Sequence, residues 1–160
     1  MNPFLPAVAL AIVVAQSQPG TVRVRKSADI DSKGAALAKK LDAIKFSGET
    51  LATDGNRTFM LAHREGSGLA EIHDTQADIM VISKGQVTMV YGGTVVDGKT
   101  TAPGETRGWA IKGGSEVKPG PGDVLHIPAK VPHQMKLDPG AQVTYFVTKV
   151  VQYPPKIGGA

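Results

Sequence analysis

The stretch GDVLHIPAKVPH, from Gly122 to His133, decides the fold. It opens with a Gly-Asp turn, continues as a short apolar strand, and leaves through a loop with a proline at either end. The loop ends on His133, and the ring of Pro132 restricts how the chain reaches that histidine. The stretch therefore predicts a strand whose outgoing loop positions one imidazole.

A second segment supplies more polar side chains. Glu71 and His73 are two residues apart on a predicted strand, so they point to the same face. After a turn at 74–76, Asp78 begins the next strand, which we expect to pair antiparallel with the first and to place Asp78 nearly opposite His73. Asp78 shares its face with apolar residues, and an inward carboxylate there must be paired, hydrogen-bonded or bound to a metal.

Together, His73, Asp78 and His133 form a set of two imidazoles and one carboxylate. Such a set suits Fe(II), Mn(II), Ni(II) or Zn(II) and leaves coordination positions open for water or substrate. Glu71 is a fourth ligand or orients a bound water, and it is the best candidate for a catalytic base. The alternative is that the two histidines are polar pocket residues without a metal and that Asp78 hydrogen-bonds backbone at a strand end.

From Phe46 onward the chain changes to short β-type runs separated by Gly, Pro, Asn and Asp. The predicted strands are 48–53, 57–64, 69–73, 78–83, 86–91, 106–112, 124–127, 134–137 and 142–151. The stretch 98–114 is irregular, and we expect a loop at 100–105. So many short strands with regular turn signals indicate an all-β sandwich or barrel.

One helix is predicted ahead of the strands. Asp31 or Ser32 can cap its start, and Leu37, Leu41 and Ile44 recur on one stripe at i, i+4 and i+7. We expect this helix to lie outside the sheet and to cover apolar surface there.

The segment around His73 resembles the first motif of the cupin superfamily, whose members are small jelly-roll β-barrels. That motif has the general form Gly-x5-His-x-His-x3–4-Glu-x6-Gly. His73 matches its second histidine, Asp78 stands at the glutamate position, and Gly85 closes the motif. Glu71 stands where the first histidine is expected.

The opening stretch resembles the second cupin motif, Gly-x5-Pro-x-Gly-x2-His-x3-Asn. Gly122, Pro128 and His133 match it in spacing, whereas Lys130 and Leu137 replace the second glycine and the asparagine. The resemblance spans about residues 59–150. It implies an all-β, cupin-like jelly-roll β-barrel with the N-terminal helix packed outside.

The amino-acid composition excludes some kinds of bond, metal site and binding partner. The chain has no cysteine, which excludes disulfides and thiolate metal sites. Its net charge is +4, but the cations are scattered and only one Trp, three Tyr and four Phe could stack bases, so we expect no nucleic-acid partner. The run Ile79 to Ile82 is apolar on both faces and needs cover on both sides, which favours a homodimer.

Three segments are expected along the chain. Residues 1–17 carry a short apolar run and small residues before Ser17, which predicts a signal peptide and a secreted or periplasmic protein with no membrane span after cleavage. The alternative is an uncleaved apolar segment or membrane anchor. Residues 18–45 are a linker and the helix, and residues 46–153 are the cupin β-barrel domain.

Three further residues have two interpretations each. Trp109 packs against the barrel rim or forms a wall of the binding pocket. His126 is a packed or pocket-lining residue rather than a ligand, and His63 is structural or reaches the pocket rim.

The functional hypothesis is an exported cupin that binds a divalent metal and a small organic molecule, as an oxygenase or isomerase would. The alternative is a metal-free, non-catalytic cupin that binds a small molecule. A third interpretation is an exported interaction protein that keeps only the barrel.

Overall fold

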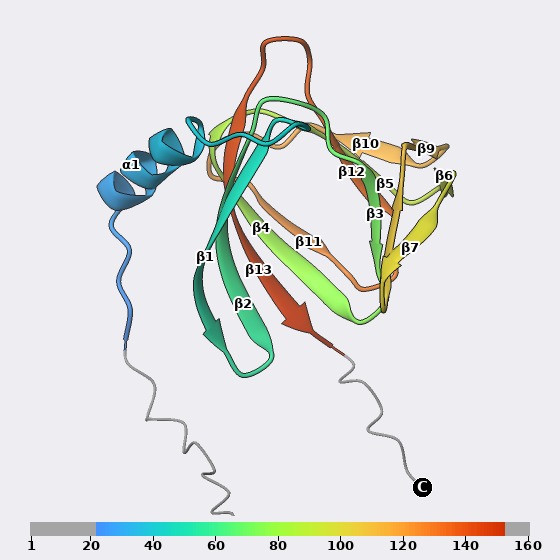
Figure 1. Ribbon diagram of the computed structural model, residues 1–160, viewed down its shortest axis with the longest axis horizontal. Helices are drawn as coiled ribbons and strands as arrows, with labels where there is room; N and C mark the ends of the chain where they lie inside the picture. The colour runs from blue at the N-terminus through green and yellow to red at the C-terminus, as the bar shows by residue number, and fades with distance from the viewer. Residues whose placement is uncertain (1–21, 153–160) are drawn as a thin grey trace, which may run out of the picture.

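The protein folds as facing antiparallel sheets with one helix on the outside (Figure 1). The computed structural model describes residues 22–152, and over this range it contains one helix and 13 strands. The elements are α1 (Ser27–Leu37), β1 (Phe46–Asp54), β2 (Arg57–Arg64), β3 (Ala70–His73), β4 (Gln76–Gly85), β5 (Thr88–Tyr91), β6 (Thr94–Val96), β7 (Lys99–Ala102), β8 (Glu105–Gly108), β9 (Ala110–Lys112), β10 (Ser115–Val117), β11 (Val124–Ile127), β12 (His133–Lys136) and β13 (Val143–Val151).

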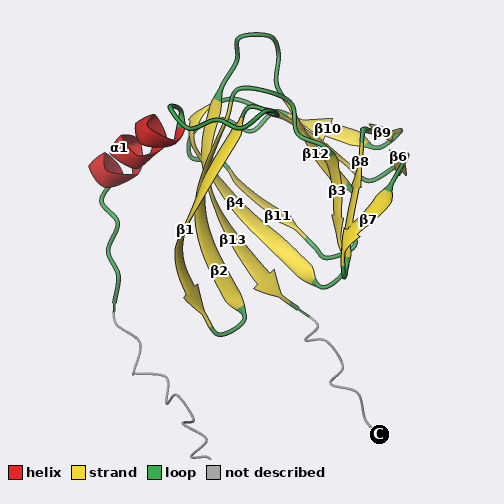
Figure 2. Ribbon diagram, in the orientation of Figure 1, coloured by secondary structure: helices red, strands yellow, loops and turns green. Residues whose placement is uncertain are grey.

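The strands form two large sheets and one small sheet. One sheet has the order β1-β2-β13-β4-β11, the second has the order β10-β5-β12-β3-β8-β7, and β6 pairs with β9. The two large sheets enclose the core between them (Figure 2). Alternate residues along a strand point inward and fill it. Ten buried side chains make up its main cluster, among them Met80, Ile82 and Tyr145. This confirms the predicted all-β jelly-roll architecture.

The predicted bounds of the helix are wrong, although its place outside the sheet is confirmed. Helix α1 begins at Ser27 and ends at Leu37. It lies against the sheet through Gly34, where a Cβ would be only 3.0 Å from a methyl group of Thr144 on β13. After the helix, the carboxylate of Asp42 accepts hydrogen bonds from the backbone N–H groups of Ile44 and Phe46, at 3.0 and 2.9 Å. Side-chain hydrogen bonds of this kind compete with helical backbone hydrogen bonds, so the helix does not extend to Ile44 as predicted. Ile44 is 49% exposed.

The stretch 98–114 contains three strands, and the loop predicted at 100–105 is wrong. Strands β7 and β8 form a hairpin whose turn includes Gly104 at φ +74°. The single strand predicted over 106–112 is divided at Trp109 into β8 and β9, which belong to different sheets. Strand β7 is exposed at every position, so it has no alternation of apolar and polar residues that would predict a strand.

The predicted pairing of the strands bearing His73 and Asp78 is also wrong. Strand β3 pairs with β8 and β12, whereas β4 pairs with β13 and β11 in the opposite sheet. The reason is that β4 is long and finds a long partner in β13, with Lys149 opposite Asp78 in the register. His73 and Asp78 therefore approach each other across the interior instead of along one hairpin.

No helix within residues 22–152 is long and apolar enough to span a membrane. The predicted signal peptide, residues 1–17, lies outside the described residues, and the three predicted segments remain predictions.

Candidate metal centre

Four predicted site residues come together between the two large sheets. Glu71 and His73 project from β3, and the β12–β3 register places His133 opposite Glu71 in the same sheet. Asp78 comes from β4 in the facing sheet and is 2% exposed. Strand alternation explains the placement, because Glu71 and His73 share one face of β3.

Ligand atoms of three of these residues, Glu71, His73 and His133, are spaced as around a single ion, and Asp78 lies beside this group. Nε2 of His73 lies 3.4 Å from Oδ2 of Asp78 and 3.5 Å from Oε2 of Glu71. Nε2 of His133 lies 3.9 and 3.8 Å from the same two oxygens. One atom from each of Glu71, His73 and His133 falls within 4.8 Å of the other two. Metal–ligand bonds of about 2.0–2.2 Å put neighbouring ligands about 3–4 Å apart, so these separations fit.

Both imidazoles are held with Nε2 toward the centre. Nδ1 of His73 is 2.7 and 2.9 Å from the two carboxylate oxygens of Glu105, and Nδ1 of His133 is 3.0 Å from the carbonyl oxygen of Val131. These oxygens only accept, so each Nδ1 carries the proton and donates it. Nε2 then offers a lone pair to a metal, the arrangement that fixes metal-binding histidines elsewhere. Nε2 of His133 is buried, and none of residues 22–152 forms a hydrogen bond with it.

The two carboxylates are ionised. Burial alone would raise the pKa of Glu71, but hydrogen bonding to His73 and the positive charge of Arg107 lower it to about 2. Burial likewise opposes ionisation of Asp78, yet its contact with His73 and the charge of Lys149 hold the pKa of this carboxyl below its usual value. Both groups therefore present negative oxygens at neutral pH, as metal ligands must.

The two histidines differ in their protonation. Burial would lower the pKa of His73, but interactions with Asp78 and Glu71 outweigh it and raise the pKa to about 9. Burial lowers the pKa of His133, and its hydrogen bond to the backbone of Val131 offsets only part of this shift. A metal ion would therefore meet a neutral His133 and would displace a proton from His73.

The sequence alone did not identify three charged residues of the centre. The ammonium of Lys149 is 3.0 Å from both oxygens of Asp78 and 3.1 Å from Nε2 of His73. Arg107 contacts Glu105 at 3.0 Å and Glu71 at 3.7 Å. The signal for Lys149 is its register opposite Asp78, which requires the sheet order to be known. The signal for Glu105 is weaker, since its surroundings predicted a loop.

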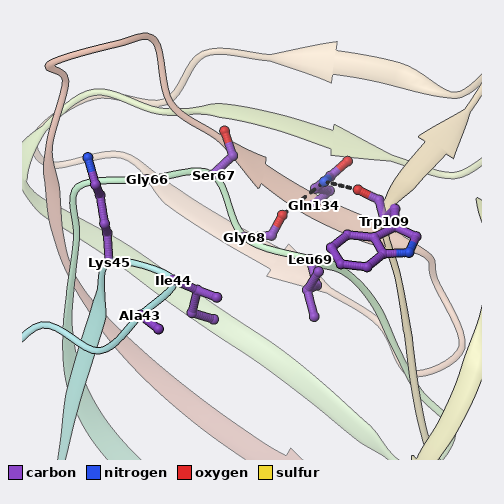
Figure 3. A pocket seen from close by; sticks show the side chains of 9 residues that line it. All are labelled: Ala43, Ile44, Lys45, Gly66, Ser67, Gly68, Leu69, Trp109 and Gln134. Carbon is purple, nitrogen blue, oxygen red and sulfur yellow. Dashed lines mark hydrogen bonds between the residues drawn. The ribbon is translucent and has the colours of Figure 1, made fainter.

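Exposure and hydrogen bonding decide between the two interpretations of His126, His63 and Trp109. His126 is exposed on β11, so it is neither packed nor in the pocket. His63 is structural, because its Nδ1 lies 2.8 Å from the hydroxyl of Thr144. Trp109 is 73% exposed and lines a pocket of about 380 Å3 at the edge of the sheets (Figure 3). Trp109 therefore forms a wall of a pocket.

Comparisons with known proteins agree on the fold. No family model and no curated protein matches the sequence. A cupin-2 domain protein from Rhodospirillum rubrum is similar in structure, with a TM-score of 0.50, 13% identity and 72% of this chain covering 66% of that chain. A Streptomyces PAC13 variant with uridine has a TM-score of 0.50 and 8% identity, and 72% of this chain covers 78% of it. A Thermus thermophilus protein has a TM-score of 0.50 and 14% identity, with coverages of 71% and 92%.

These likenesses and the order of the strands define the class: the chain has the jelly-roll fold of the cupin superfamily. Within that fold, Glu71, His73 and His133 form a group that could hold a metal ion.

Proposed function

We propose that the protein binds one divalent metal ion through Glu71, His73 and His133 and binds a small organic molecule beside it. The observation that carries this proposal is the buried Nε2 of His133, which has no hydrogen-bond partner among the described residues and lies within 4.8 Å of ligand atoms of the other two residues. Leaving such an atom without a partner costs about 1–3 kcal/mol, so a ligand is expected there. The nitrogen and oxygen donors suit Fe(II), Mn(II), Ni(II) or Zn(II).

Glu71 fits the role of ligand better than that of base. With a pKa of about 2 it is a weak proton acceptor at neutral pH, whereas an efficient general base has a pKa near the working pH. Its predicted catalytic role is therefore our second choice for this residue. Asp78 becomes a fourth ligand only if it parts from Lys149.

A bound metal would polarise an oxygen of the substrate, which serves an isomerase or an oxygenase equally. The chain's own residues would orient that substrate and exclude water from the buried side of the site. The structural relative with uridine supports a small organic ligand in this fold. Export through residues 1–17 stays part of the proposal.

One observation favours a second candidate, a metal-free cupin that binds a small molecule without catalysis. The ammonium of Lys149 already contacts Asp78 and His73, two of the three predicted ligands. A built-in cation of this kind neutralises the carboxylate in the absence of a metal.

Metal analysis of the untagged protein tests the proposal. We expect about one equivalent of metal after purification, or after titration with Fe(II), Mn(II), Ni(II) and Zn(II), and loss of that equivalent in His73→Ala and His133→Ala. The chain has four histidines, and exposed His126 provides the matched control, since His126→Ala should keep the metal. If the wild type binds none of the four metals, the metal-binding proposal is contradicted and the metal-free candidate is favoured.

A further inference from the structure

Three buried polar atoms without a hydrogen-bond partner lie in one place. Within residues 22–152 these atoms are Nη1 of Arg64, Nε2 of His133 and Oε1 of Gln134. All three side chains line the same small cavity of about 30 Å3, together with Glu71 and Tyr145. Native proteins satisfy nearly all their buried polar groups with protein, water or ligand atoms, so three exceptions around one cavity mark a place for a polar occupant.

The guanidinium of Arg64 is the charged member of this group. Arg64 is 7% exposed, and it forms no ion pair with any of the described carboxylates. It cannot lose its proton, and a buried charge is costly unless an opposite charge meets it. The group is held in place between Phe46, whose ring lies 4.5 Å from the guanidinium carbon, and Gly68, where a Cβ would be 3.1 Å from that carbon. A fixed guanidinium is suited to bind a carboxylate through two parallel hydrogen bonds.

Gln134 connects this inner cavity to the larger outer pocket. Its side-chain nitrogen donates to the carbonyl oxygens of Gly68 and Trp109, at 2.9 and 3.1 Å (Figure 3). These two bonds fix the amide, so Oε1 remains as an acceptor for a donor on the ligand. Gly68, Leu69 and Gln134 line both the inner cavity and the outer pocket.

The outer pocket has an apolar character. It is lined by Leu69, by Ile44, which is 49% exposed, and by Trp109, which is 73% exposed (Figure 3). Its volume of about 380 Å3 is within the range of about 300–1,000 Å3 that is usual for small-molecule sites. Exposed large apolar side chains gathered around an opening are typical of a ligand contact.

We propose that the ligand is a small carboxylic acid with an apolar or aromatic body. Arg64 receives the carboxylate, Oε1 of Gln134 accepts a hydroxyl or N–H of the ligand, and Trp109 contacts the body. The inference deepens the proposed function, since Glu71 and His133 line the same cavity, but Arg64 and Gln134 do not depend on a metal.

Calorimetric titration with mandelate, a hydroxy acid with a phenyl ring, tests the proposal. Lactate lacks the ring and benzyl alcohol lacks the carboxylate, and both should bind at least tenfold more weakly. Trp109 is the only tryptophan, so its fluorescence gives a second readout of occupancy. Arg64→Gln should weaken mandelate binding by about 10- to 100-fold, as expected for a charged hydrogen bond, and should leave the weak binding of benzyl alcohol unchanged.

A second variant covers the case in which Arg64→Gln fails to fold. Gly68→Ala keeps the positive charge but pushes a methyl group against the guanidinium, so it should also weaken mandelate and not benzyl alcohol. Lack of mandelate binding by folded wild type, or equal binding by wild type and both variants, overturns the inference.

The titration is repeated with the chelated and the metal-loaded protein to separate the two proposals. Mandelate binding that depends on Arg64 in a protein that takes no metal supports this inference and contradicts metal binding. A protein that binds the metal but not mandelate supports metal binding and contradicts this inference.

Discussion

The ammonium of Lys149 lies 3.0 Å from both carboxylate oxygens of Asp78. The two residues are opposite each other in the β13–β4 register, and Asp78 is almost fully buried. The same ammonium is 3.1 Å from Nε2 of His73. Lys149 therefore serves as the counter-charge of the site and competes with a metal for two of its predicted ligands.

Replacing Lys149 by methionine should have opposite effects on stability and on metal binding. Lys149→Met leaves the buried charge of Asp78 unpaired, so we expect the metal-free protein to lose on the order of 3 kcal/mol of unfolding free energy. Metal affinity should rise at least tenfold, because no ammonium competes for Asp78 and His73. Urea unfolding and metal titration measure the two effects.

The matched control is Lys33→Met. Lys33 pairs with Glu49 at 2.6 Å, but both side chains are partly exposed, at 34% and 44%. Its loss should cost less than about 1 kcal/mol. Equal stability of the two variants, or weaker metal binding by Lys149→Met, would contradict the role of counter-charge and competitor.

Glu105 should act on the metal through His73. It accepts the Nδ1–H of His73 at 2.7 Å and so holds Nε2 toward the site. Glu105→Gln should reduce metal affinity by about 10- to 100-fold, the usual effect of losing a partner of a ligating histidine. Exposed Glu116 on β10 is the control, and Glu116→Gln should match the wild type. Equal metal affinities of Glu105→Gln and Glu116→Gln would show that Glu105 does not support metal binding.

The metal-free protein should be most stable between about pH 4.5 and 6.5. The pKa of Glu71 is lowered from 4.5 to about 2, so its contribution is complete above pH 4.5 and is lost as the pH falls toward 2. The pKa of His73 is raised from 6.5 to about 9, so its contribution is complete below pH 6.5 and is lost as the pH rises through 9. Urea unfolding with a chelator present, from pH 2 to pH 9, measures the loss of stability on the acid side and on the alkaline side, which we call the acid and alkaline limbs.

His73→Gln should remove the alkaline limb, whereas His126→Gln should keep it. Unfolding free energies that stay constant from pH 6.5 to 9.5 in the wild type would show that His73 is not stabilised as its protonated form. Because a metal displaces that proton, its affinity should increase with pH over the same range.

Local signals predicted much of the fold. The bounds of β2 and β11 were predicted as they are found, because a short β-type run and the turn residues on either side of it define each strand without reference to its neighbours. Glu71 and His73 on β3 followed from their spacing of two residues on a strand, and His133 followed from the proline-bracketed loop before it. The pairing of Lys149 with Asp78 within one sheet could not be predicted, because it depends on the register of two strands whose paired residues are 71 positions apart in the chain. The wrong hairpin of β3 and β4 has the same cause.

Gly85, which closes the first cupin-like motif, should be far more sensitive than Gly113. Both glycines have positive φ, +80° and +74°, so alanine is strained at either position. A Cβ at 85 would also overlap the carbonyl oxygen of Gln142, whereas a Cβ at 113 meets no atom of residues 22–152 within 4 Å. Gly113→Ala should cost about 1 kcal/mol, and Gly85→Ala several times more. Equal losses in urea unfolding would mean that only the φ angle matters.

The predicted homodimer should use the outer face of β4 and β11. Val124 is 65% exposed and pairs in register with Val81, next to Ile79, which is 37% exposed. A second copy would cover these apolar side chains, and a buried aspartate there would cost more than the contact gains. Val124→Asp should shift the protein from dimer to monomer in sedimentation velocity, while Val117→Asp on the other sheet, where Val117 is 42% exposed, should not. A wild type that sediments as a monomer at high micromolar concentration would rule out the dimer.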